Sequence, residues 1–142
     1  MNEVIEFVEE ANTTVTSFES IKSWLLKVIS QEGKSTGVIT YVFMDDESLL
    51  EYNKQYLNHD FYTDVITFDD SNFPEINGDI LVSVDRIKDN ANQLKTEFKE
   101  EFLRVVVHGV LHLCGYKDKS ESEEKMMRSK EAFYLNQVDF NI

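Results

Sequence analysis

The chain of 142 residues is poor in the features that mark secreted, membrane-spanning or low-complexity proteins. Its single cysteine, Cys114, cannot form a disulfide within the chain, and we expect a reducing, cytoplasmic compartment. One proline and five glycines leave no linker or low-complexity tract, and no apolar run approaches the roughly 18 residues that cross a bilayer. The acidic N-terminus lacks the basic segment of a secretory signal. We therefore expect residues 1–142 to form one domain without a membrane segment.

Positive charge is scarce as well, with 14 lysine and arginine residues against 27 acidic residues and a formal net charge of −13. Non-specific attraction to nucleic acid should therefore be weak, and DNA is not an expected partner. An RNA substrate would need a local basic patch or a partner that supplies the affinity. Basic residues do gather late in the chain, at Lys117, Lys119, Lys125, Arg128 and Lys130. Glutamates interleave with them, so a solvated helix face is the simpler interpretation.

Hydrophobic residues make up 42% of the chain and charged residues 29%, as in an ordinary globular domain that can bury a core. β-branched and aromatic runs predict strands over residues 4–8, 38–44, 63–68 and 78–83. The helical period predicts helices over residues 18–29, from 45 or 46 to 56, 86–94, from 96 through 112, and from 120 to about 134. The expected fold class is α+β: a mixed sheet of about four strands with helices packed on it and a metal site at the end of a central helix.

Helix starts are predicted at side chains that can accept hydrogen bonds from the backbone of a first turn. Asp45 or Asp46 can cap the second helix, Asp85 the third and Thr96 the fourth. The Ser-x-x-Glu spacing that begins at Ser120 predicts a capping box at the start of the last helix.

The stretch Val105–Lys119 carries the strongest functional pattern in the chain. His108 and His112 are four residues apart, so on a helix their imidazoles share one face and can bind one divalent ion. Gly115 suits the left-handed position that ends a helix, and Asp118 follows as a third ligand. Three protein ligands with an open fourth position are typical of a catalytic zinc site, so we expect one Zn²⁺ per chain.

Two classes of metal-dependent hydrolase compete for this pattern. Zinc metalloproteases with an extended histidine motif carry a glutamate as general base directly after the first histidine. Gly109 occupies that position here, and no nearby residue replaces the base. Peptide hydrolysis is therefore disfavoured.

Three motifs resemble those of the YbeY family of bacterial ribosomal RNA maturation endoribonucleases. The family's H-G-x-L-H-L-x-G-Y is matched at residues 108–116, its T-D-V-L-S-F closely at 63–68, and its G-D-I-x-I-S closely at 78–83. The resemblance covers most of the chain from about residue 36. It implies a single-strand-specific, metal-dependent endoribonuclease that acts in 16S ribosomal RNA 3′-end maturation and ribosome assembly. The implied partners are ribosomal RNA and the small ribosomal subunit with its associated proteins.

The chain departs from the family pattern at the third metal ligand, which is usually a histidine and is Asp118 here. A carboxylate is a legitimate zinc ligand, but it adds negative charge that three imidazoles lack. Such an oxygen ligand also suits a harder ion such as manganese, so another divalent metal is an alternative to zinc.

A second departure is Leu57, where the family has an arginine, which the resemblance implies would face the substrate phosphate. Another cation must then neutralise the phosphate charge. Arg104, one helical turn before the first histidine, and Lys117 are the expected catalytic residues for this role. Lys119 and His59 are further candidates.

Several alternatives stay open. The nucleophile can be a metal-activated water or the 2′-hydroxyl of RNA, and the protein can instead be a ribosome-associated assembly factor with a mainly structural metal. Asp64 and Asp79 begin strands, where carboxylates often cap turns, although the resemblance favours places near the cleft. Cys114 and Tyr116 are expected to pack rather than to bind metal.

Overall fold

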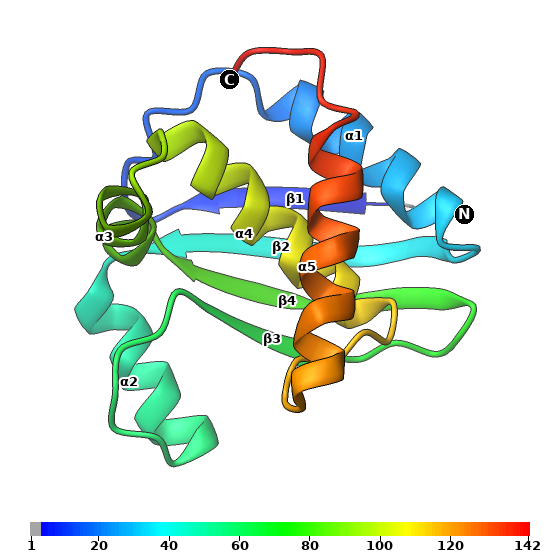
Figure 1. Cartoon of the computed structure of the whole chain (residues 1–142). Helices are drawn as coiled ribbons and strands as arrows, with labels where there is room; N and C mark the ends of the chain where they lie inside the picture. The colour runs from blue at the N-terminus through cyan, green and yellow to red at the C-terminus, as the bar shows by residue number, and fades with distance from the viewer. Residues whose placement is uncertain (1–3) are drawn as a thin grey trace.

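The structure, a computed structural model, describes residues 4–142 and contains four strands and five helices within that range (Figure 1). In chain order these are β1 (Val4–Glu9), α1 (Phe18–Gln31), β2 (Ser35–Met44), α2 (Asp46–Leu57), β3 (Val65–Asp69), β4 (Glu75–Ser83), α3 (Val84–Leu94), α4 (Phe98–Leu113) and α5 (Glu121–Leu135). Among the described residues, no helix has the length and apolar character needed to cross a membrane.

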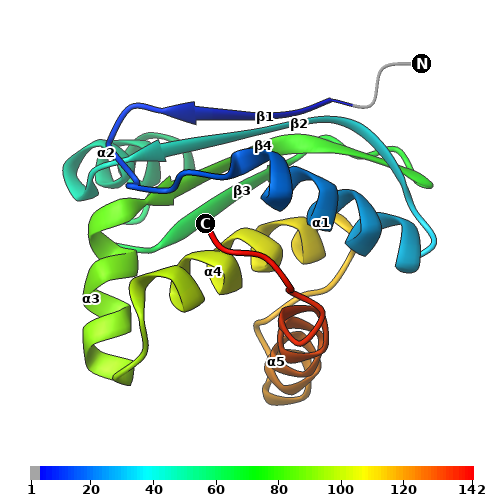
Figure 2. The same ribbon diagram turned by 90° about the horizontal axis from the view of Figure 1, so that it is seen from above.

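The strands form one mixed sheet in the order β1-β2-β4-β3. β1, β2 and β4 run parallel to one another, and β3 pairs antiparallel with β4. Figure 2 shows α1, α3, α4 and α5 on one side of this sheet, with α4 lying along it. The predicted fold class, an α+β domain with a four-stranded mixed sheet, is confirmed.

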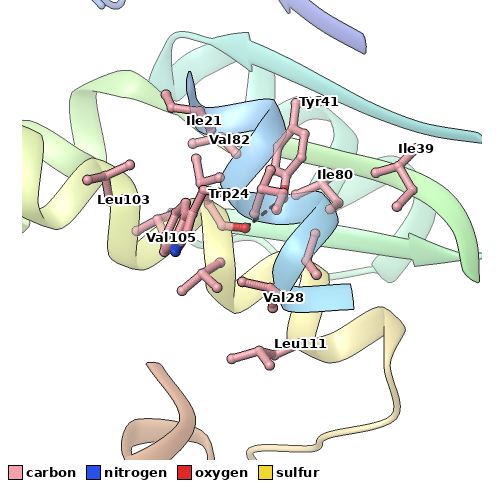
Figure 3. Packing of buried hydrophobic residues seen from close by; sticks show 14 of the residues in the cluster. Ile21, Trp24, Val28, Ile39, Tyr41, Ile80, Val82, Leu103, Val105 and Leu111 are labelled. Carbon is pink, nitrogen blue, oxygen red and sulfur yellow. Dashed lines mark hydrogen bonds between the residues drawn. The ribbon is translucent and has the colours of Figure 1, made fainter. Parts of the chain in front are cut away.

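The main core lies between the sheet and the helices α1 and α4. The residues of β2 alternate between buried and partly exposed, as expected for a strand that has one face covered by this core. Ile39, Tyr41 and Phe43 of β2 point into this core and are fully buried. Figure 3 shows side chains of α1 and α4 packed in the same cluster, among them Ile21, Trp24, Val28, Leu103, Val105 and Leu111. The Tyr41 hydroxyl donates a hydrogen bond of 2.6 Å to the carbonyl oxygen of Val106, which ties the middle of α4 to the sheet.

Two of the predicted helix starts are confirmed. The Asp45 carboxylate accepts a hydrogen bond of 2.8 Å from the Ser48 backbone N–H at the start of α2. Ser120 and Glu123 form the predicted capping box at the start of α5.

The predicted caps of α3 and α4 are wrong. Ser83, the last residue of β4, caps α3 through its hydroxyl, because the strand passes directly into the helix. Asp85 instead accepts a hydrogen bond from the Asp46 backbone N–H. Thr96 does not cap α4, since its N–H closes the end of α3 on the carbonyl of Ala91.

β4 also begins three residues earlier than predicted, at Glu75 rather than Gly78. The connection from β3 is a short turn in which the backbones of Asn72 and Glu75 hydrogen-bond to each other. The strand therefore starts directly after the turn, and Gly78 lies inside it.

Gly109 lies where α4 packs tightly against β4. A Cβ atom at this position would lie 2.8 Å from Cγ2 and 3.0 Å from Cδ1 of Ile80 on β4. Any side chain at this position would therefore collide with Ile80, so the packing seen here leaves no room for a glutamate directly after the first histidine.

Candidate metal centre

The structure brings the three predicted metal ligands together at the C-terminal end of α4. His108 and His112 come from the last turns of the helix, and Asp118 comes from the loop that leads to α5. Asp118 Oδ2 lies 3.4 Å from His108 Nε2 and 3.2 Å from His112 Nε2. The three ligand atoms lie within 4.8 Å of one another, so one cation can contact all of them.

The turn after α4 delivers the carboxylate to the histidines. Gly115 has a φ of 110°, in the left-handed region predicted for it. Its N–H donates to the carbonyl of His112, and the N–H of Tyr116 donates to the carbonyl of Leu111. These two hydrogen bonds reverse the chain at the C-terminal end of α4, and the chain then returns so that Asp118 lies beside the last turn of the helix.

The other ring nitrogen of each histidine is held by a hydrogen-bond acceptor. His108 Nδ1 donates to Glu131 Oε2 over 2.6 Å, and His112 Nδ1 donates to the carbonyl oxygen of Tyr116 over 2.9 Å. A neutral imidazole that donates through Nδ1 keeps an unprotonated Nε2. Both Nε2 lone pairs are therefore available on the side of Asp118, which is the arrangement found around metal-bound histidines.

Glu131 is the functional residue that the sequence analysis missed. Its side chain is only 2% exposed although it lies on α5, a helix rich in exposed glutamates. Burial alone would raise its pKa, but the hydrogen bond from His108 and the charges of Arg104 and Arg128 outweigh burial and lower the pKa. The available signal was its helical spacing from Met127 and Tyr134, which face the core.

Arg104 lies on the same face of α4 as His108, as predicted, but its guanidinium is surrounded by carboxylates. It bonds Glu101 at 2.5 Å and Glu131 at 3.3 Å, and it lies 3.7 Å from Asp64. Arg104 does not belong to the lining of the cleft described next. Its observed contacts are with carboxylates, two of which, Glu101 and Glu131, are buried, and contact with a phosphate stays a prediction.

A cleft of about 600 Å³ opens beside the three ligands, between the α2–β3 loop and the α4–α5 loop. Lys117 and Lys119 line it on the side of Asp118, and Leu57 and His59 line it on the side of α2. The structure therefore brings three of the four predicted phosphate-binding residues to the cleft. Asp64 also lines this cleft, whereas Asp79 lines a separate groove with Tyr52 and Tyr56.

Tyr116 packs as predicted, and its hydroxyl adds a link between the site and α1. It donates a hydrogen bond of 2.6 Å to Glu32 Oε1, at the end of α1. Glu32 also accepts from the Tyr134 hydroxyl and pairs with Lys130 at 3.2 Å. Because the Tyr116 carbonyl orients His112, Glu32 helps to hold the second imidazole indirectly.

Cys114 behaves as a buried packing residue, in line with the prediction. Burial raises the pKa of its thiol to about 12, so the sulfur is protonated near neutral pH. Its sulfur does not belong to the metal-ligand cluster of the described residues.

Replacing Glu32 by glutamine is expected to make the free energy of unfolding fall less as the pH is lowered into the acid range. Although burial opposes ionisation, the hydrogen bonds from Tyr116, Tyr134 and Lys130 lower the Glu32 pKa below 4.5. A lowered folded-state pKa stabilises the fold above the unfolded-state pKa, and this stabilisation is lost as the pH falls through the folded-state value. Urea unfolding at pH 7 and between pH 5 and pH 3 measures the effect.

The wild type should lose more stability than Glu32→Gln over this acid interval. Glu10→Gln, which changes an exposed glutamate, serves as the control and should follow the wild type. Parallel pH profiles for wild type and Glu32→Gln would contradict the assignment.

Comparison with known proteins places the chain among nucleases. Residues 5–139 match the family model described as Endoribonuclease YbeY. A protein named Endoribonuclease YbeY from Flavobacterium psychrophilum is 52% identical over 128 residues, which cover 90% of this chain and 91% of the relative. Its namesake from Flavobacterium johnsoniae is 48% identical, with 90% of this chain and 92% of the relative covered.

A solved structure shares the fold of this chain. The solution structure of TM1509 from Thermotoga maritima superposes with a TM-score of 0.69 at 27% sequence identity, covering 94% of this chain and 88% of the other. The family model spans both histidines, the carboxylate of the α4–α5 loop and the glutamate of α5. On this match, and on the two closely similar relatives, the chain belongs to the YbeY family of endoribonucleases.

Proposed function

We propose that this protein is a metal-dependent endoribonuclease that cleaves single-stranded RNA during 16S ribosomal RNA 3′-end maturation and ribosome assembly. The observation that carries the proposal is the convergence of two imidazole Nε2 atoms and one carboxylate at the wall of an open cleft. Membership of an endoribonuclease family supplies the reaction class.

The donor set fits a divalent metal ion. His108 and His112 offer nitrogen and Asp118 offers oxygen, a combination that zinc accepts in sites with an open fourth position. When bound, such an ion polarises a phosphoryl group and lowers the pKa of an attacking water. We propose zinc as the ion, with manganese as the alternative that the carboxylate favours.

The cations of the α4–α5 loop are proposed to bind the RNA backbone. Lys117 and Lys119 line the same cleft as the ligand cluster, so a phosphate beside the ligands would lie within their field. They would compensate for Leu57, which stands where the family has an arginine. Arg104 would act mainly by holding Glu131 in place, since carboxylates already occupy its donors.

The charge of the chain bears on its partners. A net charge of −13 opposes association with free RNA, so we propose that the small ribosomal subunit and its proteins present the substrate in the cytoplasm. DNA is not a proposed substrate.

One alternative function has an observation in its favour. Leu57 replaces the arginine of the family, and the guanidinium of Arg104 is paired with three carboxylates. Neither position therefore supplies a free positive charge for binding a substrate phosphate. An assembly factor that binds the subunit and keeps a structural metal would need no such charge.

Cleavage of a labelled single-stranded fragment from the 3′ end of 16S ribosomal RNA tests the proposal, with and without small subunits. Zinc-loaded wild type should cut the fragment, and His112→Ala of matched purity should not. Circular dichroism verifies that the variant is folded, and a metal assay verifies that zinc binding is lost. Equal cutting by both proteins would indicate a contaminating nuclease. Binding of subunits without any cutting would favour the assembly factor.

A further inference from the structure

The α2–β3 loop carries two stacked aromatic rings on the wall of the cleft. The His59 and Phe61 ring centroids are 5.0 Å apart and their planes differ by 22°. Both residues line the cleft that contains the metal-ligand cluster. Phe61 is 55% exposed, although an aromatic ring of its size usually buries most of its area. A stacked pair left open to a substrate cleft suggests a surface that binds another ring.

The loop that bears these rings is fixed by one buried residue. Asn53 of α2 is 1% exposed, and its side-chain amide donates a hydrogen bond of 2.8 Å to the carbonyl oxygen of Phe61. The backbone carbonyl of Asn53 accepts a hydrogen bond of 3.1 Å from the His59 backbone N–H. Asn58, between helix and loop, adopts the left-handed conformation with a φ of 56°. Because the backbone is held on both sides of the ring pair, the rings keep their place at the cleft.

The two walls of the cleft differ in chemistry. The α2–β3 wall presents His59 and Phe61, and the α4–α5 wall presents Lys117 and Lys119 beside Asp118. Grooves that bind single-stranded nucleic acid combine these two elements, cations that follow the phosphates and aromatic rings on which bases stack. The bases of a duplex are paired and stacked on one another, so they cannot occupy such a surface.

We propose that His59 and Phe61 form a base-stacking site for a nucleotide that flanks the cleaved phosphate of single-stranded RNA. This inference rests on the proposed function and specifies how the same cleft takes its substrate. The stack of two rings continues with one base of the RNA, while the neighbouring phosphate faces Lys117 and Lys119. Stacking requires no positive charge, which accounts for an RNA cleft that has Leu57 in place of an arginine. Every base has a stacking face, so the site selects unpaired nucleotides over paired ones with little sequence preference.

Binding of a short single-stranded RNA that contains one 2-aminopurine tests the site, because stacking quenches the fluorescence of this base. The full chain is titrated in EDTA, which prevents metal-dependent cleavage. Wild type should quench the fluorescence, and Phe61→Ala should lose the quench and bind about tenfold more weakly. Phe61→Tyr keeps an aromatic face and should retain both. Phe133→Ala removes a ring that is 53% exposed on α5, outside the lining of the cleft, and should behave as wild type.

Two further measurements separate this site from the cleavage reaction. In the zinc-loaded cleavage assay, Phe61→Ala should raise KM about tenfold and leave kcat nearly unchanged, because the ring binds the flanking base rather than the reacting phosphate. A duplex of the same sequence should give no quench with wild type.

The outcomes are distinguishable. Equal quenching and affinity in wild type and Phe61→Ala, quenching of the duplex, or no RNA binding by wild type would each overturn the stacking site. Loss of the quench in Phe61→Ala would support the site even if zinc-loaded wild type cleaves no RNA, a result that would refute only the nuclease proposal.

Discussion

Replacing Glu131 by alanine is expected to weaken zinc binding by about 10- to 100-fold and to lower the free energy of unfolding by about 3–5 kcal/mol. The carboxylate accepts a hydrogen bond from His108 Nδ1 and lies 3.3 Å from the Arg104 guanidinium, in a site that is almost closed to solvent. Its removal leaves the imidazole free to turn or change tautomer, and it leaves Arg104 with one buried partner fewer. Zinc titration against a chromophoric chelator and urea unfolding measure the two effects.

Two control variants separate position from charge. Glu131→Gln can still accept the hydrogen bond from His108 Nδ1 through its amide oxygen but cannot neutralise Arg104, so zinc affinity should fall less than in Glu131→Ala. Glu124→Ala removes an exposed glutamate from the same helix and should change stability by no more than about 0.5 kcal/mol. Wild-type zinc affinity in Glu131→Ala would show that His108 needs no acceptor at Nδ1.

Replacing Gly109 by alanine is expected to destabilise the protein by about 1–3 kcal/mol, the usual range for overpacking a well-packed core. The higher helix propensity of alanine would add about 1 kcal/mol of stability at an unconstrained site. Here the new methyl group would lie 2.8 Å from Ile80, so the steric cost outweighs the gain in propensity. Gly109→Glu should be more severe, because it brings a longer, charged side chain into the same contact.

A double-mutant cycle identifies the collision. Ile80→Ala removes the atoms that meet the new methyl group and by itself should cost about 2–5 kcal/mol, because Ile80 is fully buried. Gly109→Ala should cost less in the Ile80→Ala background than in the wild type, as measured by urea unfolding. Equal costs in both backgrounds would place the strain elsewhere.

The parts of the site that depend on local spacing could be predicted from the sequence. His108 and His112 share a helix face because of their separation, and Gly115 reverses the chain because it adopts a positive φ at little cost. Both local rules agree with the observed position of Asp118 beside the imidazoles.

The remaining parts depend on how distant elements pack together. Glu131 reaches His108 only because α5 crosses the end of α4, and nothing in the spacing of 23 residues specifies that crossing. The same contact decides the surroundings of Arg104, which the local pattern alone placed toward a substrate. Asp85 is of a residue type that often caps helices, yet its carboxylate accepts a hydrogen bond from the backbone N–H of Asp46 in α2. Sequence patterns indicate the roles that a side chain can have, and tertiary packing determines which contacts it makes.

The exposure of the three ligands has a consequence for the rate at which an ion enters and leaves. Asp118 is 39% exposed, His112 24% and His108 12%, so an arriving cation meets the carboxylate first and the most buried imidazole last. The histidines lie on a helix held by the sheet, whereas Asp118 lies on a loop. Opening of that loop alone would leave an ion with two ligands, and we therefore expect loop motion, rather than unfolding of α4, to set the residence time of the metal.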